Sequence, residues 1–188
     1  EPLKLFMNNK IVVFISGRGS NAKNIINYFS DNSDFQVSHV FSNNKYSDFV
    51  NYIKSKNVQY FLFEEAEING KVFRELKKIN PKLIILAGFL KKIPTSYINF
   101  FKNKIINIHP SLLPKFKGLN THERAIKNKE IYSGCTVHFV NSKLDSGKII
   151  LQKKLKIFKN ETPKSLATKI LIQEHKLYPK AICKIFKL

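Results

Sequence analysis

The sequence predicts an α/β fold: a doubly wound, mainly parallel sheet with an antiparallel edge and a long C-terminal helix. Three observations predict it. Short apolar runs of strand length alternate with amphipathic stretches through the first half of the chain, which is the pattern of βαβ units. Farther along, two strand-like runs are separated only by a loop, which favours antiparallel pairing. The C-terminal stretch then repeats apolar side chains at helical spacing.

The first half of the chain supplies the parallel strands. Ile11–Ser16 is a continuous apolar run bounded by Gly17, as expected of a strand that is buried on both faces. Further strands are expected at residues 35–41, 58–63, 83–87 and 104–108. Helices are expected between them at residues 20–30, 48–56 and 68–78, and in a short stretch from Pro94.

The second half has a different pattern. Strands are expected at residues 136–140 and 149–157, and a helix at residues 162–187. We expect core packing, and not a ligand site, from the apolar stripe of that helix. The stripe consists of Leu166, Ile170, Leu171, His175, Tyr178 and Ile182.

Length and composition favour a single cytoplasmic domain over residues 1–188. The chain has 188 residues and its apolar runs are shorter than the ~20 residues that span a bilayer. The only methionine, Met7, suggests that residues 1–6 are a non-native leader. Cys135 and Cys183 are expected to be reduced thiols. Cys135-x-x-His138 is at most half of a metal site, so no metal is expected.

The chain is strongly basic, with 33 lysines and arginines against 13 acidic residues and a net charge of +20. Thirty of the basic residues are lysines, whereas base-edge readout relies mainly on the arginine fork. No specific nucleic-acid partner and no membrane are therefore expected. The lysines are either a solvated surface or a functional polyanion patch, and in both cases they would attract phosphate-bearing substrates.

A glycine loop follows the first strand and precedes the first helix. Its sequence is SGRGSN, residues 16–21. Glycine allows positive φ and close backbone approach, and the free N–H groups of the next helix favour a phosphate. The loop is either a phosphate cradle that includes Gly19, Ser20 and Asn21 or a tight turn without a ligand.

The same loop also fits the dinucleotide pattern G-x-G-x-x-A, from Gly17 to Ala22. That pattern requires an acidic residue at the end of the second strand, where it binds a ribose. The sequence there is FSNNK, residues 41–45, which has no acid. A nicotinamide dehydrogenase is therefore disfavoured.

Asn107 and His109 lie two residues apart on a predicted strand, so their side chains point to the same face. They stand at the carboxyl end of that strand, where open α/β sheets bind ligands. The sequence continues as PSLLP, in which one of the X–Pro bonds could be cis. Asp145, in a turn after the next strand, could return to hydrogen-bond His109 and orient its ring. Taken alone, each of these residues is equally compatible with a structural role.

Seven motifs resemble the phosphoribosylglycinamide (glycinamide ribonucleotide) formyltransferase family over nearly the whole chain, from about Lys10 to Pro179. They are SGRGSN (Ser16–Asn21), LAGFLKKI (Leu86–Ile93), INIHPSLLPKFKG (Ile106–Gly118), THERAI (Thr121–Ile126), GCTVHFV (Gly134–Val140), LDSGKIILQ (Leu144–Gln152) and QEHKLYP (Gln173–Pro179). The resemblance implies a Rossmann-like formyltransferase fold. It also implies formyl transfer from 10-formyltetrahydrofolate, the co-substrate, to the amine of N1-(5-phospho-D-ribosyl)glycinamide in purine (IMP) biosynthesis, without a metal.

Site residues follow from the resemblance where the motifs match. Asn107, His109 and Asp145 correspond to the catalytic residues. Gly19, Ser20 and Asn21 correspond to the substrate phosphate loop, and Glu174 to the acid that contacts the glycinamide part. The N-terminal half would bind phosphate and the C-terminal half folate. Folate-binding residues would be Leu90, Lys91, Lys92, Ile93, Asn107, Asn141, Ser142, Lys143, Leu144 and Asp145.

The chain departs from the family at two places. Lys91 stands where the family usually has arginine, and residues 64–71 are a shortened version of the region that supplies a folate-contacting arginine. Two relatives with the same catalytic residues, one formylating initiator tRNA and one hydrolysing formyltetrahydrofolate, carry additional domains that this chain is not expected to have. Partners would be small-molecule substrates, with either a monomer or a homodimer. A lysine-rich nucleic-acid-binding protein without catalysis is the alternative from another class.

Overall fold

The protein is described by a computed structural model that covers residues 9–32 and 34–188. The expected start at Met7 and the leader at residues 1–6 lie outside the described residues. Two compact units make up the chain, Glu1–Lys104 and Ile105–Leu188. Within the described ranges, each helix is either too short or too polar to cross a bilayer.

The first unit is built on parallel strands. They are β1 (Lys10–Ile15), β2 (Gln36–Ser42), β3 (Gln59–Leu62) and β4 (Leu83–Leu86), in the spatial order β3-β2-β1-β4. Each neighbouring pair is parallel, and Val13 of β1 pairs with Val40 of β2 and Ile85 of β4. β1 and β4 are buried along nearly their whole lengths, as their continuous apolar sequences predict.

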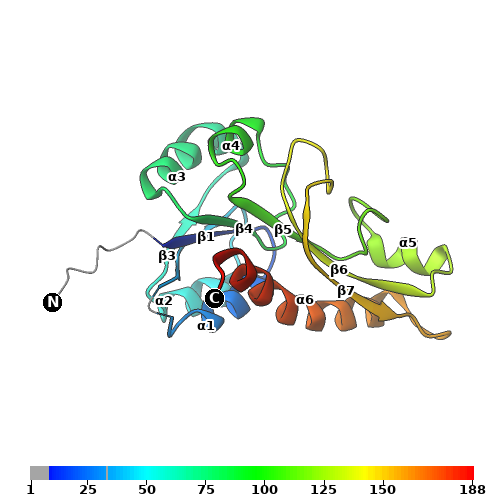
Figure 1. The fold of residues 1–188 in the computed structure, drawn as a ribbon. Coiled ribbons are helices and arrows are strands. Elements are labelled where there is room, and N and C mark those ends of the chain that lie inside the picture. Colours follow the sequence, from blue (N-terminus) through cyan, green and yellow to red (C-terminus); the bar gives the residue numbers. More distant parts are fainter. Residues whose placement is uncertain (1–8, 33) are drawn as a thin grey trace. The chain divides into compact units, whose positions relative to one another are not determined.

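Helices cover both faces of these strands. Figure 1 shows α1 (Ser20–Tyr28) and α2 (Ser47–Lys54) on one side, and α3 (Phe73–Ile79) and α4 (Thr95–Phe100) on the other. The prediction of a doubly wound parallel arrangement is therefore confirmed. The helix predicted from residue 68 differs in detail, because a 3-10 turn (Glu65–Glu67) and a π-helical turn (Ile68–Val72) precede α3.

The second unit contains antiparallel strands and a long helix. β5 (Ile105–His109) pairs with β6 (Tyr132–Phe139), which pairs with β7 (Ile149–Lys156), and both pairs are antiparallel. The predicted antiparallel edge is confirmed, although β6 begins at Tyr132 and not at Thr136. The helix α5 (Thr121–Lys127) was not predicted.

The long helix α6 (Pro163–Phe186) runs beside β6 and β7 (Figure 1). Its apolar stripe differs from the predicted one. Leu171 is exposed and His175 is half-buried, whereas Glu174 and Leu177 are buried. The difference arises because the stripe is predicted from apolar side chains. That criterion includes Leu171 and omits the polar Glu174, although Glu174 lies on the buried face. The buried residues are Leu166, Ile170, Glu174, Leu177, Tyr178, Pro179, Ala181 and Ile182.

Candidate active site

The second unit brings Asn107, His109 and Asp145 together. Asn107 and His109 alternate with buried Ile106 and Ile108 on β5 and therefore share a face. Asp145 comes from the loop after β6, with a left-handed backbone (φ 45°) that aspartate tolerates better than most residues. Its Oδ2 atom lies 3.4 Å from Nδ1 of His109. The expected return of Asp145 to His109 is confirmed as geometry.

The carboxylate of Asp145 is held by the backbone as well. The N–H of Gly118 donates to Oδ2 of Asp145 at 2.9 Å. The side chains of both His109 and Asp145 are buried, with 7% and 8% of their surfaces exposed. Because water is largely excluded, the attraction between the carboxylate and a protonated ring is stronger than it would be on the surface.

His109 faces acceptors at both of its ring nitrogens. Nδ1 faces Asp145, and Nε2 lies 2.8 Å from the carbonyl oxygen of Phe116. The carbonyl only accepts, so Nε2 carries the proton of this hydrogen bond and is the ring nitrogen that can donate to a developing negative oxygen.

His138 completes this cluster and was considered in the sequence only as half of a metal site. It lies directly opposite Asn107 in the β5–β6 pair. Its Nδ1 lies 2.9 Å from the carbonyl oxygen of Phe139, its Nε2 lies 3.4 Å from Nδ2 of Asn107, and its Nε2 lies 3.7 Å from Oδ1 of Asp145. The signal that could have found it is the antiparallel register, which places residue 138 beside residue 107.

The electrostatics of His138 favour a neutral ring. Burial lowers its pKa, with an opposing contribution from the Phe139 carbonyl and Asp145. The carbonyl only accepts, so Nδ1 carries the proton, and the lone pair of Nε2 accepts from the Asn107 amide. His138 therefore orients the amide of Asn107.

A hydrogen-bond network stiffens the loop after His109. The hydroxyl of Thr136 donates to the carbonyl of Ser111 at 2.7 Å and accepts from the N–H of Leu113 at 3.2 Å. Gln152 donates to the same hydroxyl at 2.7 Å. The Leu113–Pro114 bond is cis, as considered possible from the sequence.

Glu174 lies on α6 with only 7% of its surface exposed. Its charge acts on Cys135 and Tyr178. Burial is the main cause that raises the pKa of the Cys135 thiol to about 12, and Glu174 raises it further. Glu174, which the resemblance assigns to the glycinamide part, is thus a buried acid. Proteins rarely bury an acidic side chain unless it is paired or has a function.

In the first unit, the glycine loop joins β1 to α1 as predicted. Gly19 has φ 75° and occupies the N-cap position of α1, where a Cβ atom would collide with the ring of Phe49. Ser20 and Asn21 form the first turn of this helix, at its positive dipole end. Ser20 is exposed and Asn21 is buried. This geometry suits an anion at the helix N-terminus.

The end of β2 carries an amide where a dinucleotide site would need an acid. Asn44 follows β2 and donates through Nδ2 to the carbonyl of Ser16 at 2.8 Å. The side chain thus holds the glycine loop at Ser16.

The segments expected to bind folate lie in both units. In the first unit, Leu90 is 70% exposed, Lys91 forms an ion pair with Glu65 at 2.6 Å, Lys92 is exposed and Ile93 is buried. Because the side chain of Ile93 packs in the core, only its backbone is available to a ligand. In the second unit, residues 141–144 are exposed and precede Asp145. Within residues 9–32 and 34–188, no group of three or more metal-ligating side chains is present.

Known proteins resemble the chain along most of its length. The model of the formyl transferase family matches residues 9–182. The phosphoribosylglycinamide formyltransferase of Haemophilus influenzae is 36% identical over 182 residues, covering 92% of this chain and 85% of that protein. The chloroplastic phosphoribosylglycinamide formyltransferase of Arabidopsis thaliana is 35% identical over 186 residues, and the chain spans 64% of its length. The crystal structure of the phosphoribosylglycinamide formyltransferase from Anaplasma phagocytophilum has a TM-score of 0.85 at 38% identity, covering 92% of this chain and 84% of that one.

Proposed function

Because the chain belongs to the phosphoribosylglycinamide formyltransferase family, we propose that it transfers the formyl group of 10-formyltetrahydrofolate to the amine of N1-(5-phospho-D-ribosyl)glycinamide. The observation that carries the proposal is the buried pair of His109 and Asp145, with the half-buried Asn107 on the same face of β5 as His109. A carboxamide, an imidazole and a carboxylate in this arrangement suit acyl transfer to an amine, which needs an oxyanion stabiliser and a proton path.

In the proposed reaction, the neutral amine attacks the formyl carbon and forms a C–N bond. The carbonyl oxygen becomes negative, and Asn107 and His109 donate hydrogen bonds to it. The bond between the formyl carbon and N10 then breaks, and the proton lost by the amine moves to N10. Each donor contributes about 3 kcal/mol by analogy with other oxyanion sites. Holding the two substrates together contributes roughly 7–11 kcal/mol.

Asp145 orients the His109 ring through Nδ1 and stabilises its charged form. Nε2 of His109 is bonded to the Phe116 carbonyl at 2.8 Å. To donate to the substrate, Nε2 must therefore exchange that carbonyl for the formyl oxygen. Substrate binding is expected to shift the backbone at Phe116.

We assign substrate binding to the remaining residues of the two units, which together would form one formyltransferase domain. The phosphate would be bound by Gly19, Ser20 and Asn21, and the glycinamide part by Glu174. The folate would be bound by residues 90–93 and 141–145. Support for the phosphate assignment comes from the left-handed Gly19 at the N-terminus of α1, where the helix dipole favours an anion.

We also infer a cytoplasmic enzyme. Neither Cys135 nor Cys183 forms a disulfide, as expected in a reducing compartment. Cell fractionation tests this inference, and recovery of the protein only in an organelle or an extracellular fraction would contradict it.

Formyl transfer by the purified protein tests the proposed function. The assay supplies 10-formyltetrahydrofolate with either phosphoribosylglycinamide or methionyl initiator tRNA as the acceptor. We expect turnover only with the ribonucleotide. His109→Ala and Asp145→Asn should each lower kcat by about 100- to 1000-fold, because a donor to the oxyanion, or its orientation, is lost.

His39→Gln is the matched control, because His39 is a half-buried histidine of the first unit outside the proposed site. It should keep wild-type kcat, and unchanged melting curves should show that all variants fold. Near-normal kcat in both site variants, or formylation of tRNA alone, would contradict the proposal.

A further inference from the structure

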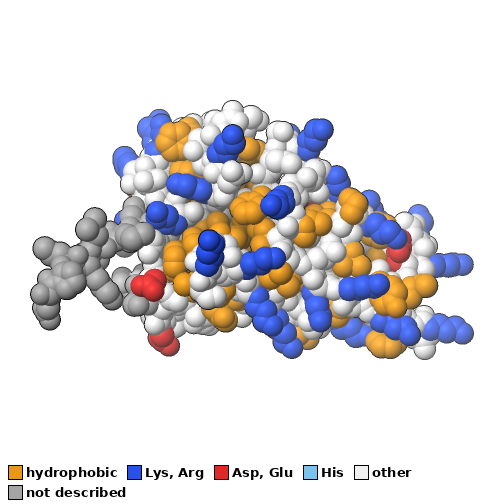
Figure 2. Space-filling view, in the orientation of Figure 1, with side chains coloured by type: hydrophobic (Ala, Val, Ile, Leu, Met, Phe, Trp, Pro, Cys, Tyr) orange, Lys and Arg blue, Asp and Glu red, His pale blue; other side chains and the backbone are white. Residues whose placement is uncertain are grey.

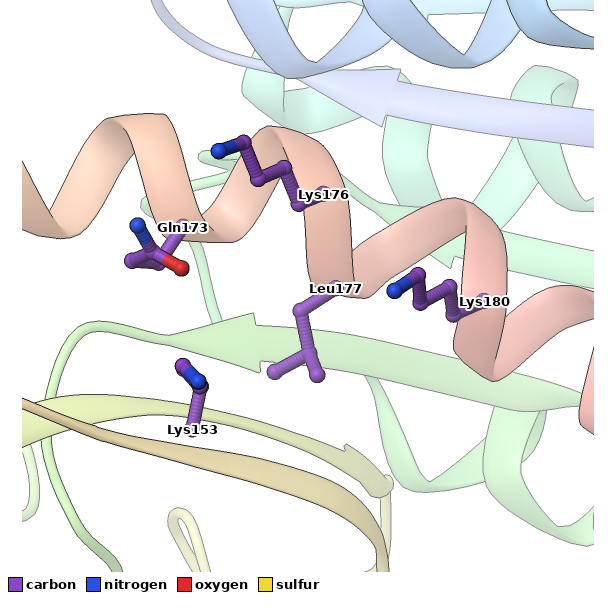
Figure 3. Close-up of a pocket in the computed structure, with 5 residues that line it drawn as sticks. All are labelled: Lys153, Gln173, Lys176, Leu177 and Lys180. Atoms are coloured by element: carbon purple, nitrogen blue, oxygen red, sulfur yellow. The ribbon is translucent and has the colours of Figure 1, made fainter.

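A pocket lies between α6 and β7 in the second unit, apart from the residues assigned to formyl transfer. Figure 3 shows the side chains that line it, and its volume is about 260 Å³. The lining residues are Lys153, Gln173, Lys176, Leu177 and Lys180. Three of these five side chains are lysines and none is acidic, so the pocket is cationic.

The helix presents its four lining residues on one face. Residues 173, 176, 177 and 180 follow the i, i+3, i+4, i+7 spacing, which places them side by side. Leu177 points to the strands and forms an apolar floor, while Lys176 and Lys180 lie one turn apart above it (Figure 3). Farther along the helix, Lys184 donates to the carbonyl of Ile150 at 3.0 Å and ties this part of α6 to β7.

Lys153 reaches the same pocket from β7. Its neighbour Gln152 bonds to Thr136, and its other neighbour Lys154 lies 3.7 Å from the centre of the Tyr132 ring. Successive side chains of a strand point to opposite faces. Lys153 is therefore directed to the face where α6 packs, and Figure 3 shows it rising from the strand towards the helix.

The three pocket lysines have no protein counter-ion among the described residues. The second unit contains 17 lysines and arginines but only five acidic residues. Glu130 pairs with Lys115, and Glu161 pairs with Lys169. Asp145 faces two histidines. The last two acids are Glu174, which is buried and acts on Cys135 and Tyr178, and Glu123, which lies on α5.

Positive charge alone does not single out this pocket, because lysines are spread over the face drawn in Figure 2. What this place adds to the charge is a hollow lined by residues of both α6 and β7. Three lysine side chains from two elements line one hollow, and a bound anion would offset the repulsion among their charges. Lysine binds phosphate as a point charge and does not need the planar geometry that arginine requires.

We propose that this pocket binds a small anion with two linked phosphate groups, either free pyrophosphate or the diphosphate of a nucleotide. A single phosphate, with a charge of about −1.5 to −2, leaves part of the lysine charge uncompensated. The amide of Gln173 adds a neutral donor at the rim. Gln173 is one position from Glu174 and therefore about 100° away around the helix axis. Glu174 itself is not among the residues that line the pocket.

Calorimetric titration of the full chain tests the proposal. The titrants are inorganic pyrophosphate, ADP and inorganic phosphate, each at about 0.1 M salt so that surface charges are screened. We expect one pyrophosphate or ADP per chain and weaker binding of single phosphate. The triple variant Lys153→Gln, Lys176→Gln, Lys180→Gln should bind at least about tenfold more weakly, because three charge-assisted contacts are lost.

A second triple variant controls for net charge. Lys127→Gln, Lys156→Gln and Lys164→Gln remove the same charge from exposed positions of the second unit outside the pocket, and this variant should bind as the wild type does. Tighter binding of pyrophosphate than of ADP identifies the free anion, and the reverse identifies the nucleotide. The proposal is overturned by no diphosphate binding, by equal loss in both triple variants, or by equal affinity for single phosphate. Formyl transfer should persist in both triple variants, which separates this test from that of the enzymatic activity.

Discussion

His138 contacts the backbone carbonyl of Phe139 through Nδ1 and the side-chain amide of Asn107 through Nε2. The tautomer of its ring decides which way the Asn107 amide faces. With the proton on Nδ1 bound to the Phe139 carbonyl, Nε2 can only accept. The Asn107 amide then turns its NH₂ group towards His138 at 3.4 Å. The reverse tautomer would leave the Phe139 carbonyl without this donor and would turn the amide around. His138 is thus a positioning residue for Asn107.

Two substitutions of His138 distinguish its contact with the Asn107 amide from its contact with the Phe139 carbonyl. In His138→Gln, the side-chain oxygen reaches the position of Nε2 and can still accept from Asn107. In His138→Asn, the shorter amide reaches only the position of Nδ1. We expect kcat to fall about fivefold in His138→Asn, from the loss of a hydrogen bond worth about 1 kcal/mol, and to recover in His138→Gln, with KM unchanged in both.

Steady-state kinetics measure this difference, and melting curves check that both variants fold. A purely structural role for His138 would lower stability in both variants and leave kcat the same in each. Equal kcat values for the glutamine and asparagine variants would therefore contradict the positioning role.

At the scale of residues, the sequence predicted the contact between Asp145 and His109 but not the neighbours of Asn107. The approach of Asp145 to His109 was expected because a turn acid often orients a histidine, and their distance of 3.4 Å agrees with it. The neighbours of Asn107 were not expected, because the partner of a strand residue depends on the register of β5 against β6. Register is set by burial of both strands together, so one strand alone does not reveal it.

At the scale of elements, α6 begins at a complete capping box. The hydroxyl of Thr162 accepts from the N–H of Ser165 at 3.1 Å, and the hydroxyl of Ser165 accepts from the N–H of Thr162 at 3.0 Å. Pro163 occupies the first turn, where its missing N–H costs nothing. The same helix carries Glu174 and one side of the lysine pocket.

Thr162→Ala should lower the free energy of unfolding by about 0.5–2 kcal/mol, because an amide at the start of α6 loses its acceptor. Thr168→Ala is the matched control. Thr168 is exposed in the interior of the same helix, where alanine is the better helix former, so stability should not fall. Urea unfolding measures both variants, and an equal loss in the two would show that the cap is not the cause.

Two elements escaped prediction for a shared reason. α5 has only seven residues, and the stretch that precedes α3 is a π-helical turn. Short helices and irregular turns have little apolar periodicity of their own and are held by packing. In α5 the buried residues are Thr121 and Ala125, which no hydrophobic pattern would single out.

At the scale of the whole molecule, buried histidines make stability depend on pH. Burial is the main cause that lowers the pKa of His39, His122, His138 and His175 below 6.5. Below pH 6.5 the unfolded chain therefore binds more protons at these positions than the folded chain does. Stability is fully present above that pH and is lost as the pH falls towards the lowered values.

We expect the melting temperature to fall as the pH is lowered from about 7.5 to about 5.5. Glu67 and Glu161 contribute only at lower pH, because hydrogen bonds from the Glu64 backbone and from Lys169 hold their respective pKa values below 4.5. Added salt should leave most of the decrease in place, since burial and not charge repulsion is its main cause. Differential scanning calorimetry measures it, and a constant melting temperature across this window would contradict the prediction.

The sequence by itself determined the α/β class, the parallel and antiparallel parts of the fold, and the positions of Asn107, His109 and Asp145. These depend on local patterns, namely apolar runs, glycine turns and short motifs, which each segment carries alone. Only the tertiary structure decided the contact of His138 with Asn107, the burial of Glu174 and the placement of Lys153, Lys176 and Lys180 around one pocket. Those features arise where separate elements pack together, and the energy of packing depends on both surfaces at once.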